Sequence, residues 1–271
     1  MTGSPLWLAP SYPCDADIYA AIWLRTQAKA MKNIGMTPNV IAPVPWVPPG
    51  FTFFSNKWDR YIGAPYREDD EGIEIFRPRY FSHPKEHKFG APHLMQLIRL
   101  MYEAIKKPSV IHAHFALQQG WVGLHLAKRW KVPLVVSLLG DDVNVYPHFS
   151  EGDMKRFKAV IAGADVVISQ GSALDDATEV MTGRRPRSLP LGVNVERFTR
   201  QRSREQAKLD LDLSQDKTII LFVGSLVENK GIPELLLCIE ALSHHDIFAV
   251  FIGDGPLRSQ IDAMPNTLAA G

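Results

Sequence analysis

The chain has 271 residues and a formal net charge of +1, with 46% hydrophobic and 22% charged residues. This is the ordinary balance of a soluble globular protein, and the length allows two modest domains or one large domain. A near-neutral chain gives no global electrostatic reason to bind nucleic acid, and its local arginine clusters are typical of solvated loops.

The two cysteines, Cys14 and Cys238, lie far apart and belong to no metal or redox motif, so we expect free thiols in a reducing compartment. No apolar run approaches the ~20 residues that span a bilayer, and no basic stretch precedes an apolar core near the start. These features predict a cytoplasmic protein. A peripheral contact with the inner face of the membrane, for instance through Lys106 and Lys107, stays open.

Strand and helix patterns alternate along most of the chain. The apolar runs are continuous rather than alternating, which is typical of parallel strands covered by helices on both faces. The sequence therefore predicts a doubly wound α/β fold. We expect strands at 5–9, 40–42, 73–76, 110–111, 133–138 and 166–169, helices at 16–34, 92–107, 118–130 and 152–162, and a further helix that begins with a capping box of Ser172 and Asp175.

An arginine-rich stretch with little apolar periodicity, residues 184–206, interrupts this pattern before it restarts at Thr218. We place a domain boundary near Thr199. This gives an N-terminal Rossmann-like domain at 1–198 and a partial second Rossmann-like domain at 199–271. Within the first domain, the proline-rich segment 43–49 is predicted to be a loop.

A turn with two glycines and a lysine joins a buried strand to a helix in LFVGSLVENKGIPELL, residues 221–236. Backbone N–H groups at such a turn can approach an anion, and Lys230 can add a full positive charge. The stretch FIGDGPLRSQI, residues 251–261, has the same geometry, so two turns could line one ligand site at one edge of a small sheet. An ordinary turn fits the pattern equally well, since neither stretch is a common nucleotide-binding motif.

Two histidines, His112 and His114, stand at the end of a predicted strand and face the same side of it. Doubly wound folds keep their ligands at this end of the strands, so we interpret the pair as contacts to a polar ligand. The alternative is one packed and one exposed histidine, and a metal pair is disfavoured because no ligand spacing follows. Asp141 and Asp142 follow the next strand, where carboxylates hold sugar hydroxyls or a histidine, or else form a turn and cap a helix.

Other catalytic motifs are absent or do not fit their context. HPKEH, residues 83–87, has the spacing of one metalloprotease class, but Pro84 makes the required helix doubtful and we treat the match as chance. The chain has no GxSxG and no CxxC.

The order of the motifs is more specific than each motif alone. In chain order they read SYP, EGIEIFRPRY, VIHAHF, PLVVSLLGDD, ADVVISQGSAL, LPLGVNVERF, LFVGSLVENKGIPELL and FIGDGPLRSQI. This plan resembles that of family 4 glycosyltransferases, which are retaining enzymes of the GT-B architecture, over nearly the whole chain. Nucleotide-sugar epimerases share the architecture, but the LPLGVN and VENKGIPELL motifs favour a transferase.

The resemblance implies two Rossmann-like domains, the first for the acceptor and the second for a nucleotide-sugar donor. It implies transfer of a sugar from a nucleoside diphosphate to a hydroxyl of a glycan or lipid-linked acceptor, with retention, in polysaccharide biosynthesis. No metal or other cofactor is expected, because positive charge and helix dipoles would stabilise the leaving diphosphate.

Residue by residue, the resemblance assigns His114 to catalysis beside the donor sugar and Lys230 to the diphosphate. His112, Asp141 and Asp142 are candidates for acceptor or cleft contacts. The donor-binding residues that it implies are Gly224, Ser225, Lys230, Gly253, Asp254, Gly255, Pro256 and Leu257.

The chain departs from the family pattern at several points. The first loop, YPCDAD, lacks a glycine pair, Ser225 stands where many members have arginine, and Leu139 precedes Gly140 where HG is usual. The glutamate motif E-x7-E is missing, since no two glutamates are eight positions apart. We therefore expect a chain truncated within the donor domain, with impaired catalysis and uncovered apolar surface. The alternative is a non-catalytic glycan-binding fragment, or one that a partner chain completes.

Overall fold

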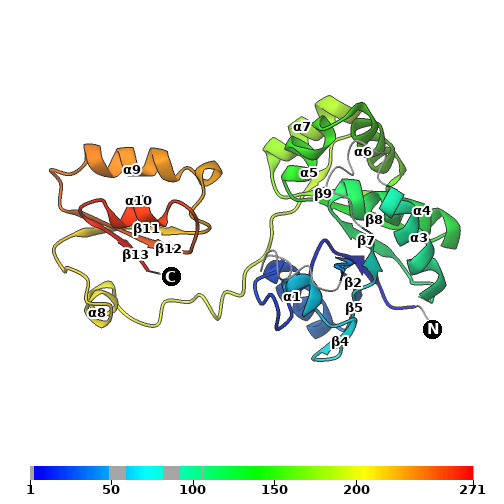
Figure 1. The fold of residues 1–271 in the computed structure, drawn as a ribbon, viewed down its shortest axis with the longest axis horizontal. Helices are drawn as coiled ribbons and strands as arrows, with labels where there is room; N and C mark the ends of the chain where they lie inside the picture. The colour runs from blue at the N-terminus through cyan, green and yellow to red at the C-terminus, as the bar shows by residue number, and fades with distance from the viewer. Residues whose placement is uncertain (1–2, 49–58, 82–91, 105, 271) are drawn as a thin grey trace. The chain divides into compact units, whose positions relative to one another are not determined.

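The computed structural model describes residues 3–48, 59–81, 92–104 and 106–270 (Figure 1). The chain divides into two compact units, Met1–Val195 and Glu196–Gly271, which we call unit 1 and unit 2. The division falls within the arginine-rich stretch, close to the boundary expected near Thr199.

Unit 1 is built on an eight-stranded sheet with the order β10-β9-β8-β7-β1-β2-β5-β4. Every neighbouring pair is parallel except β4 and β5, which form an antiparallel hairpin. The strands are β1 Leu6–Leu8, β2 Asn39–Ile41, β4 Arg67–Asp70, β5 Ile73–Phe76, β7 Ile111–His114, β8 Leu134–Leu138, β9 Val166–Ser169 and β10 Arg187–Ser188. The parallel order with crossovers confirms the predicted α/β fold.

Helices cover both faces of this sheet (Figure 1). Leu6 and Leu8 of β1 pack into the core that α3, α4 and α6 share, whereas Trp7 between them packs into the core below α1. This alternation follows from the two-residue period of a strand and leaves neither face to water. The helices are α1 Ile22–Asn33, α2 Asp59–Ile62, α3 Pro92–Ala104, α4 Trp121–Trp130, α5 Asp141–Asn144, α6 Glu151–Gly163 and α7 Ser172–Thr182, with a π-helical turn η4 Ala116–Gly120 and a 3-10 turn η5 Tyr146–His148.

Three local predictions for unit 1 are wrong, and the first is the helix expected at 16–34, which begins only at Ile22. Helix α7 begins at Ser172, but its N-cap is Gly171, which has no side chain with which to cap the helix. Asp175 accepts a hydrogen bond from the Ser169 hydroxyl and does not form a capping box with Ser172. The segment predicted as a proline-rich loop contains β3 Val44–Pro45, which pairs in parallel with β6 Arg79–Tyr80. Pro45 is tolerated there because Val44 and Trp46, on either side of it, donate the backbone hydrogen bonds of the pair.

Unit 2 has a three-stranded parallel sheet, β11-β12-β13, with one apolar core. Helix α9 contributes Ile232, Leu236 and Ile239 to this core, and α10 contributes Ile261. Its elements are α8 Arg204–Asp210, β11 Thr218–Val223, a 3-10 turn η6 Glu228–Lys230, α9 Ile232–Ala241, β12 Ile247–Ile252, α10 Arg258–Asp262 and β13 Thr267–Ala269.

The sheet of unit 2 also carries exposed apolar side chains. Leu221 and Val223 of β11 are 59% and 67% exposed, and Ile252 of β12 and Leu268 of β13 are each 43% exposed. Leu221 lies in register with Leu268 through Val250, and Val223 lies opposite Ile252, so these side chains share one face. The residues that build the core alternate with them and point to the other face.

Candidate functional site

The two predicted site histidines lie side by side at the carboxyl end of β7. The ring centroids of His112 and His114 are 4.1 Å apart, so the two side chains face the same side of the strand as predicted. Trp7 of the neighbouring strand β1 contacts both rings, at centroid distances of 5.6 and 4.8 Å. Trp23, in the first turn of α1, lies 5.8 Å from the ring of His114. The pair is therefore enclosed by two tryptophans that the sequence alone did not mark.

Both imidazoles are neutral at neutral pH. Burial lowers the pKa of His112 to about 4, and burial together with the neighbouring His112 lowers the pKa of His114 well below its ordinary value. His112 Nε2 lies 2.8 Å from the hydroxyl oxygen of Ser137 on β8. The side chain of His114 is buried, and neither ring nitrogen has a hydrogen-bond partner among the described residues. Unused hydrogen-bonding capacity in a buried ring is a property expected of a ligand contact.

Asp142 holds two turns of this sheet edge together. Its Oδ1 accepts hydrogen bonds from the N–H groups of Leu139 and Gly140, at 2.9 and 3.0 Å. Its Oδ2 accepts one from the N–H of Ala116, at 2.9 Å, which begins the π-helical turn after β7. The side chain is fully buried, and burial raises its pKa although the three hydrogen bonds oppose that rise. These contacts fit the turn-forming reading of Asp142, while Asp141 is exposed, and an acceptor contact by either stays a prediction.

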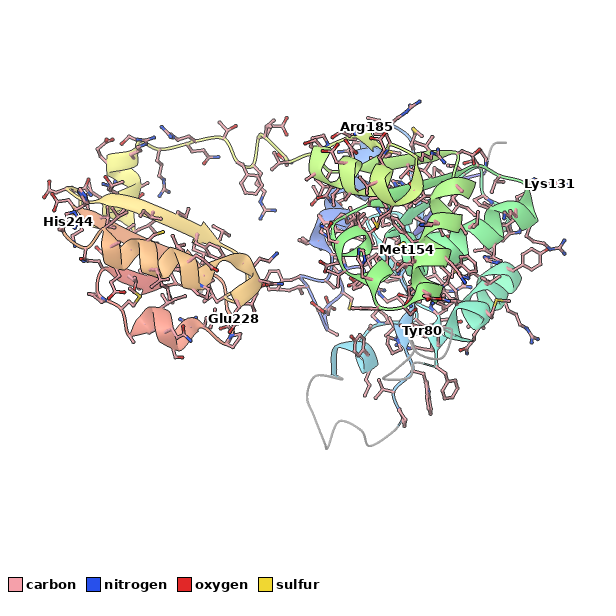
Figure 2. The ribbon with its side chains drawn as sticks, turned by 90° about the horizontal axis from the view of Figure 1, so that it is seen from above. Tyr80, Lys131, Met154, Arg185, Glu228 and His244 are labelled. Carbon is pink, nitrogen blue, oxygen red and sulfur yellow. The ribbon has the colours of Figure 1, made fainter. Side chains whose placement is uncertain are left out.

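A cavity of about 330 Å³ opens at the same edge of the sheet. It was not predicted, because its walls come from four separate segments. Three of these segments follow β1, β2 and β5, and the fourth includes the end of α2. Tyr80, which lines the cavity, is labelled in Figure 2. The lining residues are Pro10, Ser11, Tyr12, Cys14, Asp17, Ala20, Ala42, Pro43, Val44, Pro45, Tyr61, Ala64, Arg77 and Tyr80.

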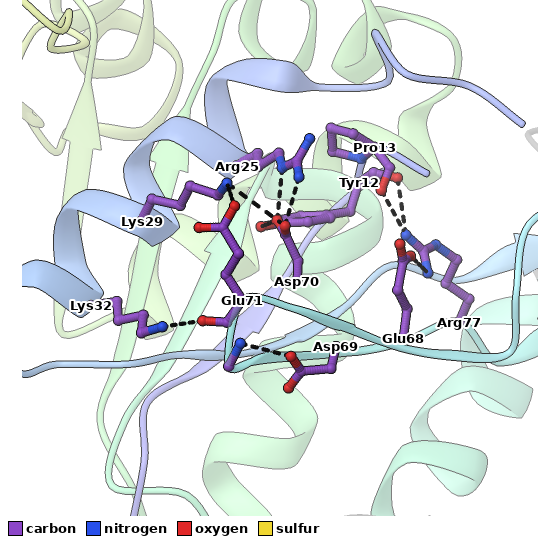
Figure 3. A network of polar contacts seen from close by, with 11 residues as sticks. Tyr12, Pro13, Arg25, Lys29, Lys32, Glu68, Asp69, Asp70, Glu71 and Arg77 are labelled. Carbon is purple, nitrogen blue, oxygen red and sulfur yellow. Dashed lines mark hydrogen bonds and ion pairs between the residues drawn. The ribbon is translucent and has the colours of Figure 1, made fainter. Parts of the chain in front are cut away.

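A buried arginine fixes the loop that forms one wall of this cavity. Arg77 is 1% exposed, and its guanidinium donates to the carbonyl oxygen of Pro13 at 2.9 Å and lies 2.8 Å from a carboxylate oxygen of Glu68. The stretch EGIEIFRPRY contains this arginine, but a buried arginine cannot be told from an exposed one by its neighbours in sequence. Figure 3 shows Arg77 reaching from β5 toward the loop after β1.

A second polar network ties the same loop to α1 (Figure 3). Asp70 at the end of β4 accepts two hydrogen bonds from Arg25, at 2.6 and 2.7 Å, and one from the Tyr12 hydroxyl at 3.1 Å. Burial alone would raise the pKa of Asp70, but the hydrogen bonds from Arg25 and Tyr12 lower it overall. Lys29 lies 2.7 Å from Glu71 in the same network. Because α1 carries Trp23, this network also holds the wall beside His114.

The two predicted donor turns of unit 2 lie against each other at the carboxyl edge of its sheet. The N–H of Gly224 donates to the carbonyl of Ile252 at 2.9 Å, and the N–H of Leu226 donates to the carbonyl of Asp254 at 2.9 Å. A Cβ on Gly255 would lie 2.4 Å from the carbonyl oxygen of Leu226. The glycines are thus required by the close approach of the two turns, whatever ligand they meet.

The remaining predicted donor residues surround these turns. Lys230 ends the 3-10 turn η6 and is exposed, and Gly231 after it adopts a left-handed conformation that lets α9 begin at Ile232. Ser225, Asp254 and Pro256 are exposed, whereas Leu257 is buried in the core of unit 2. The sequence therefore predicted correctly that the two turns share one edge, and contact with a nucleotide stays a prediction.

No group of three or more His, Cys, Asp and Glu side chains in the described part of the chain could hold a metal ion. The HPKEH stretch, residues 83–87, lies outside the described residues. Within the ranges that the structure describes, no helix has the length and apolar character to cross a membrane.

Comparison with known proteins decides the family. The model of Glycosyltransferase Family 4 matches residues 25–197. The chain belongs to this family. It is 31% identical over 260 residues to the "Putative teichuronic acid biosynthesis glycosyltransferase TuaC" of Bacillus subtilis strain 168, covering 94% of this chain and 67% of that protein. It is 30% identical over 145 residues to a D-inositol 3-phosphate glycosyltransferase of Streptomyces bingchenggensis, covering 50% of this chain and 31% of that protein.

Solved structures of other proteins have a fold similar to that of this chain. Anabaena Alr3699/HepE in complex with UDP matches with a TM-score of 0.59 and 17% identity, over 95% of this chain and 62% of that chain. A trehalose-phosphate synthase of Burkholderia vietnamiensis matches with a TM-score of 0.63 and 14% identity, over 97% and 66%. These likenesses confirm the GT-B-like fold class. The chain spans about two thirds of the length of TuaC and of these structures.

Proposed function

We propose that this chain is a glycosyltransferase that moves a sugar from a nucleoside-diphosphate donor to a hydroxyl of a glycan or lipid-linked acceptor, with retention, in polysaccharide biosynthesis. Family membership supports the reaction class. The observation that carries the donor assignment is the pair of turns in unit 2, where Gly224 and Gly253 bring two strand ends together beside Lys230.

Unit 2 would bind the diphosphate of the donor. Exposed Lys230 supplies a positive charge, and the N–H groups at the start of α9 add the partial charge of a helix terminus. Together they stabilise the negative charge that develops as the sugar leaves, which is electrostatic catalysis. UDP is the first nucleotide to test, because HepE has been crystallised with UDP and with UDP-glucose.

Unit 1 would contribute His114 to the reaction. Its neutral imidazole can donate one hydrogen bond and accept another, which suits a sugar hydroxyl better than a phosphate. Trp7 and Trp23 fix the orientation of the ring, and they exclude water from it. In this proposal His114 orients the donor sugar as a hydrogen-bonding group and does not act as a positive charge.

Titration calorimetry of the chain with UDP, GDP and ADP tests the donor assignment. We expect UDP to bind and Lys230→Ala to weaken binding by roughly tenfold, because a charge-assisted contact to phosphate is lost. Arg204→Ala is the matched control, since it removes an exposed positive charge from α8 of the same unit. Equal affinities of the wild type and Lys230→Ala would refute the role of Lys230.

A non-catalytic function is the second candidate, and the exposed apolar face of unit 2 favours it. Leu221, Val223 and Ile252 on that face suit contact with another polypeptide. Light scattering during size exclusion tests this alternative with co-expressed or mixed partner chains. A chain that stays a monomer and transfers sugar by itself would rule it out.

A further inference from the structure

The role proposed for His114 conflicts with its burial. The side chain is 1% exposed, and both ring nitrogens are buried without a hydrogen-bond partner among the described residues. A histidine that hydrogen-bonds a sugar hydroxyl must present a ring nitrogen to it. One of the walls around this ring must therefore move before a sugar can reach it.

The rings of His112, Trp7 and Trp23 form these walls. His112 and Trp7 stand on the strands β7 and β1, with centroids 4.1 and 4.8 Å from the ring of His114. Trp7 is buried within the core below α1, so its displacement would disrupt close packing. Trp23, at 5.8 Å, is half-buried, stands in the first turn of α1 and packs only at the margin of that core. Of these walls, Trp23 is the one that can move.

The chain that leads into Trp23 is held weakly. The N–H of Ile22 donates to the carbonyl of Tyr19 at 3.4 Å, whereas about 2.9 Å is ordinary for this bond. The N–H of Ala20 donates to the carbonyl of Asp17 at the same long distance. The side chain of Tyr19 is 79% exposed. A segment with long hydrogen bonds and exposed side chains opens at a low cost in free energy.

Ala21 adds backbone strain at the same point. It is the N-cap of α1, with a φ of 47° and a ψ of 45°, and its side chain makes no hydrogen bond to the helix. This left-handed conformation is unfavourable for a residue that has a Cβ, and glycine would adopt it freely. The strain is relieved when this segment leaves its present arrangement, so it favours opening.

The helix is fixed immediately after Trp23. Leu24 and Ala28 are fully buried. Arg25 donates two hydrogen bonds to Asp70, at 2.6 and 2.7 Å (Figure 3). Movement is therefore confined to the first turn of α1 and the segment before it, and the rest of unit 1 stays in place.

We infer that Trp23 is a gate over His114 and that Ala21 is its hinge. In the closed form Trp23 covers the imidazole and keeps water from it. In the open form the first turn of α1 swings away and a sugar can reach a ring nitrogen of His114. The inference rests on the proposed function, because it describes how the donor sugar gains access to this residue.

Modification by diethyl pyrocarbonate tests the gate without any donor. The reagent acylates an accessible, unprotonated imidazole nitrogen, and fragmentation mass spectrometry assigns each adduct to its histidine. We expect Trp23→Ala to speed the modification of His114 at least about tenfold. The reason is that the ring stays uncovered in the variant, whereas the wild type uncovers it only in a minor population of about 0.1–10%. Equal rates in the two proteins overturn the inference.

Trp121→Ala is the matched control for this substitution. Trp121 is half-buried like Trp23, and its ring lies 4.6 Å from that of a different histidine, His125. Its removal should leave the rate at His114 unchanged. A rate at His114 that rises as much as in Trp23→Ala would show a general loosening of unit 1 and would overturn the gate.

Urea separates local opening from the unfolding of unit 1. Opening of one helical turn exposes little surface, so the rate at His114 in the wild type should stay constant in urea well below the unfolding midpoint. A rate that climbs from the lowest urea concentrations, or a His114 that is modified only as the protein unfolds, would mean that global unfolding exposes the ring. Either result overturns the gate.

Ala21→Gly tests the hinge. Glycine relieves the left-handed strain of the closed form, and this gain exceeds the extra chain entropy of glycine, so the modification of His114 should slow about threefold. Ala30→Gly is the matched control, because it changes an exposed alanine of the same helix without relieving such strain. A rate that rises or stays the same in Ala21→Gly overturns the role of Ala21.

The outcome is independent of the donor assignment. A chain that binds UDP through Lys230, but whose His114 is equally protected with and without Trp23, keeps the proposed function and loses the gate. A chain in which Trp23 controls access to His114, but which does not bind UDP, keeps the gate and loses the donor assignment.

Discussion

A Cβ atom on Gly253 would lie 2.0 Å from the carbonyl oxygen of Gly224, on the neighbouring turn of unit 2. No real Cβ contact is this short, and the backbone of Gly253 has a φ of +142°, which side-chain-bearing residues rarely adopt. The two turns approach because β11 and β12 are parallel and in register up to Val223 and Ile252. The geometry that places the predicted donor turns together therefore depends on this glycine.

Gly253→Ala should destabilise unit 2 by about 3 kcal/mol, through the backbone clash and the strained φ. Gly192→Ala is the control, because nothing lies within 4 Å of its Cβ position and no left-handed φ is needed there. All six tryptophans lie in unit 1, so hydrogen exchange in β11 and β12 is the better measurement for unit 2. Unchanged protection of these strands in Gly253→Ala would contradict the prediction.

Asp142→Ala should destabilise unit 1 by about 3 kcal/mol, because it leaves the N–H groups of Ala116, Leu139 and Gly140 buried without their acceptor. Urea unfolding followed by tryptophan fluorescence measures the loss. Asp141→Ala removes the neighbouring, exposed carboxylate and should change stability by less than about 0.5 kcal/mol. Similar effects of the two substitutions would show that Asp142 does not hold the turns together.

Asp70→Asn should cost unit 1 about 3 kcal/mol at neutral pH, because Arg25 and Tyr12 lose their charged acceptor in a buried site. Glu71→Gln, at the exposed end of the same network, is the control and should cost far less. The folded-state pKa of Asp70 is lowered, so its contribution is present above its ordinary pKa and is lost as the pH falls through the lowered value. The difference between the urea midpoints of the wild type and Asp70→Asn should therefore be smaller at pH 3 than at pH 7. A difference that does not change with pH would contradict the prediction.

How far the sequence predicts this molecule depends on the range of the contacts involved. The shared orientation of His112 and His114 was predictable, because a two-residue period puts them on one side whatever surrounds them, although the strand was predicted at 110–111 and extends to His114. The edge shared by the two turns of unit 2 was predictable for a similar reason, since parallel strands end at the same edge. The wall of Trp7 and Trp23 was not, because it depends on which strand and helix lie next to β7.

The polar network and the cavity illustrate the same limit. Tyr12 and Asp70 are 58 residues apart, and no local pattern marks them as partners. The capping box at Ser172 fails for a related reason: the local pattern was present, but Asp175 found a better partner in Ser169 across the turn. Local signals describe which contacts are available, and the packed sheet decides which of them form.

The histidine pair enclosed by Trp7 and Trp23 predicts a specific pH dependence of stability. Unfolding returns His112 from a pKa of about 4 to its ordinary value near 6.5, so the unfolded state binds more protons between these two values. Stability is therefore full above about pH 6.5 and falls as the pH drops toward 4. His112 alone should cost about 2 kcal/mol between pH 7.5 and pH 5, and His114 adds a loss of the same sign.

His112→Gln isolates this contribution, because Gln keeps a polar contact to Ser137 but does not titrate. Groups away from the pair change protonation equally in both proteins, including Asp142, whose raised pKa acts in the opposite direction. His114, beside His112, keeps the larger cause of its lowered pKa, which is burial, in the variant. Between pH 7.5 and pH 5, the free energy of unfolding of the wild type should therefore fall by about 2 kcal/mol more than that of His112→Gln. His148→Gln, at an exposed histidine of the same unit, is the matched control. A difference that stays constant with pH would mean that His112 is solvated in the folded protein, and the neutral site proposed for His114 beside it would then fail as well.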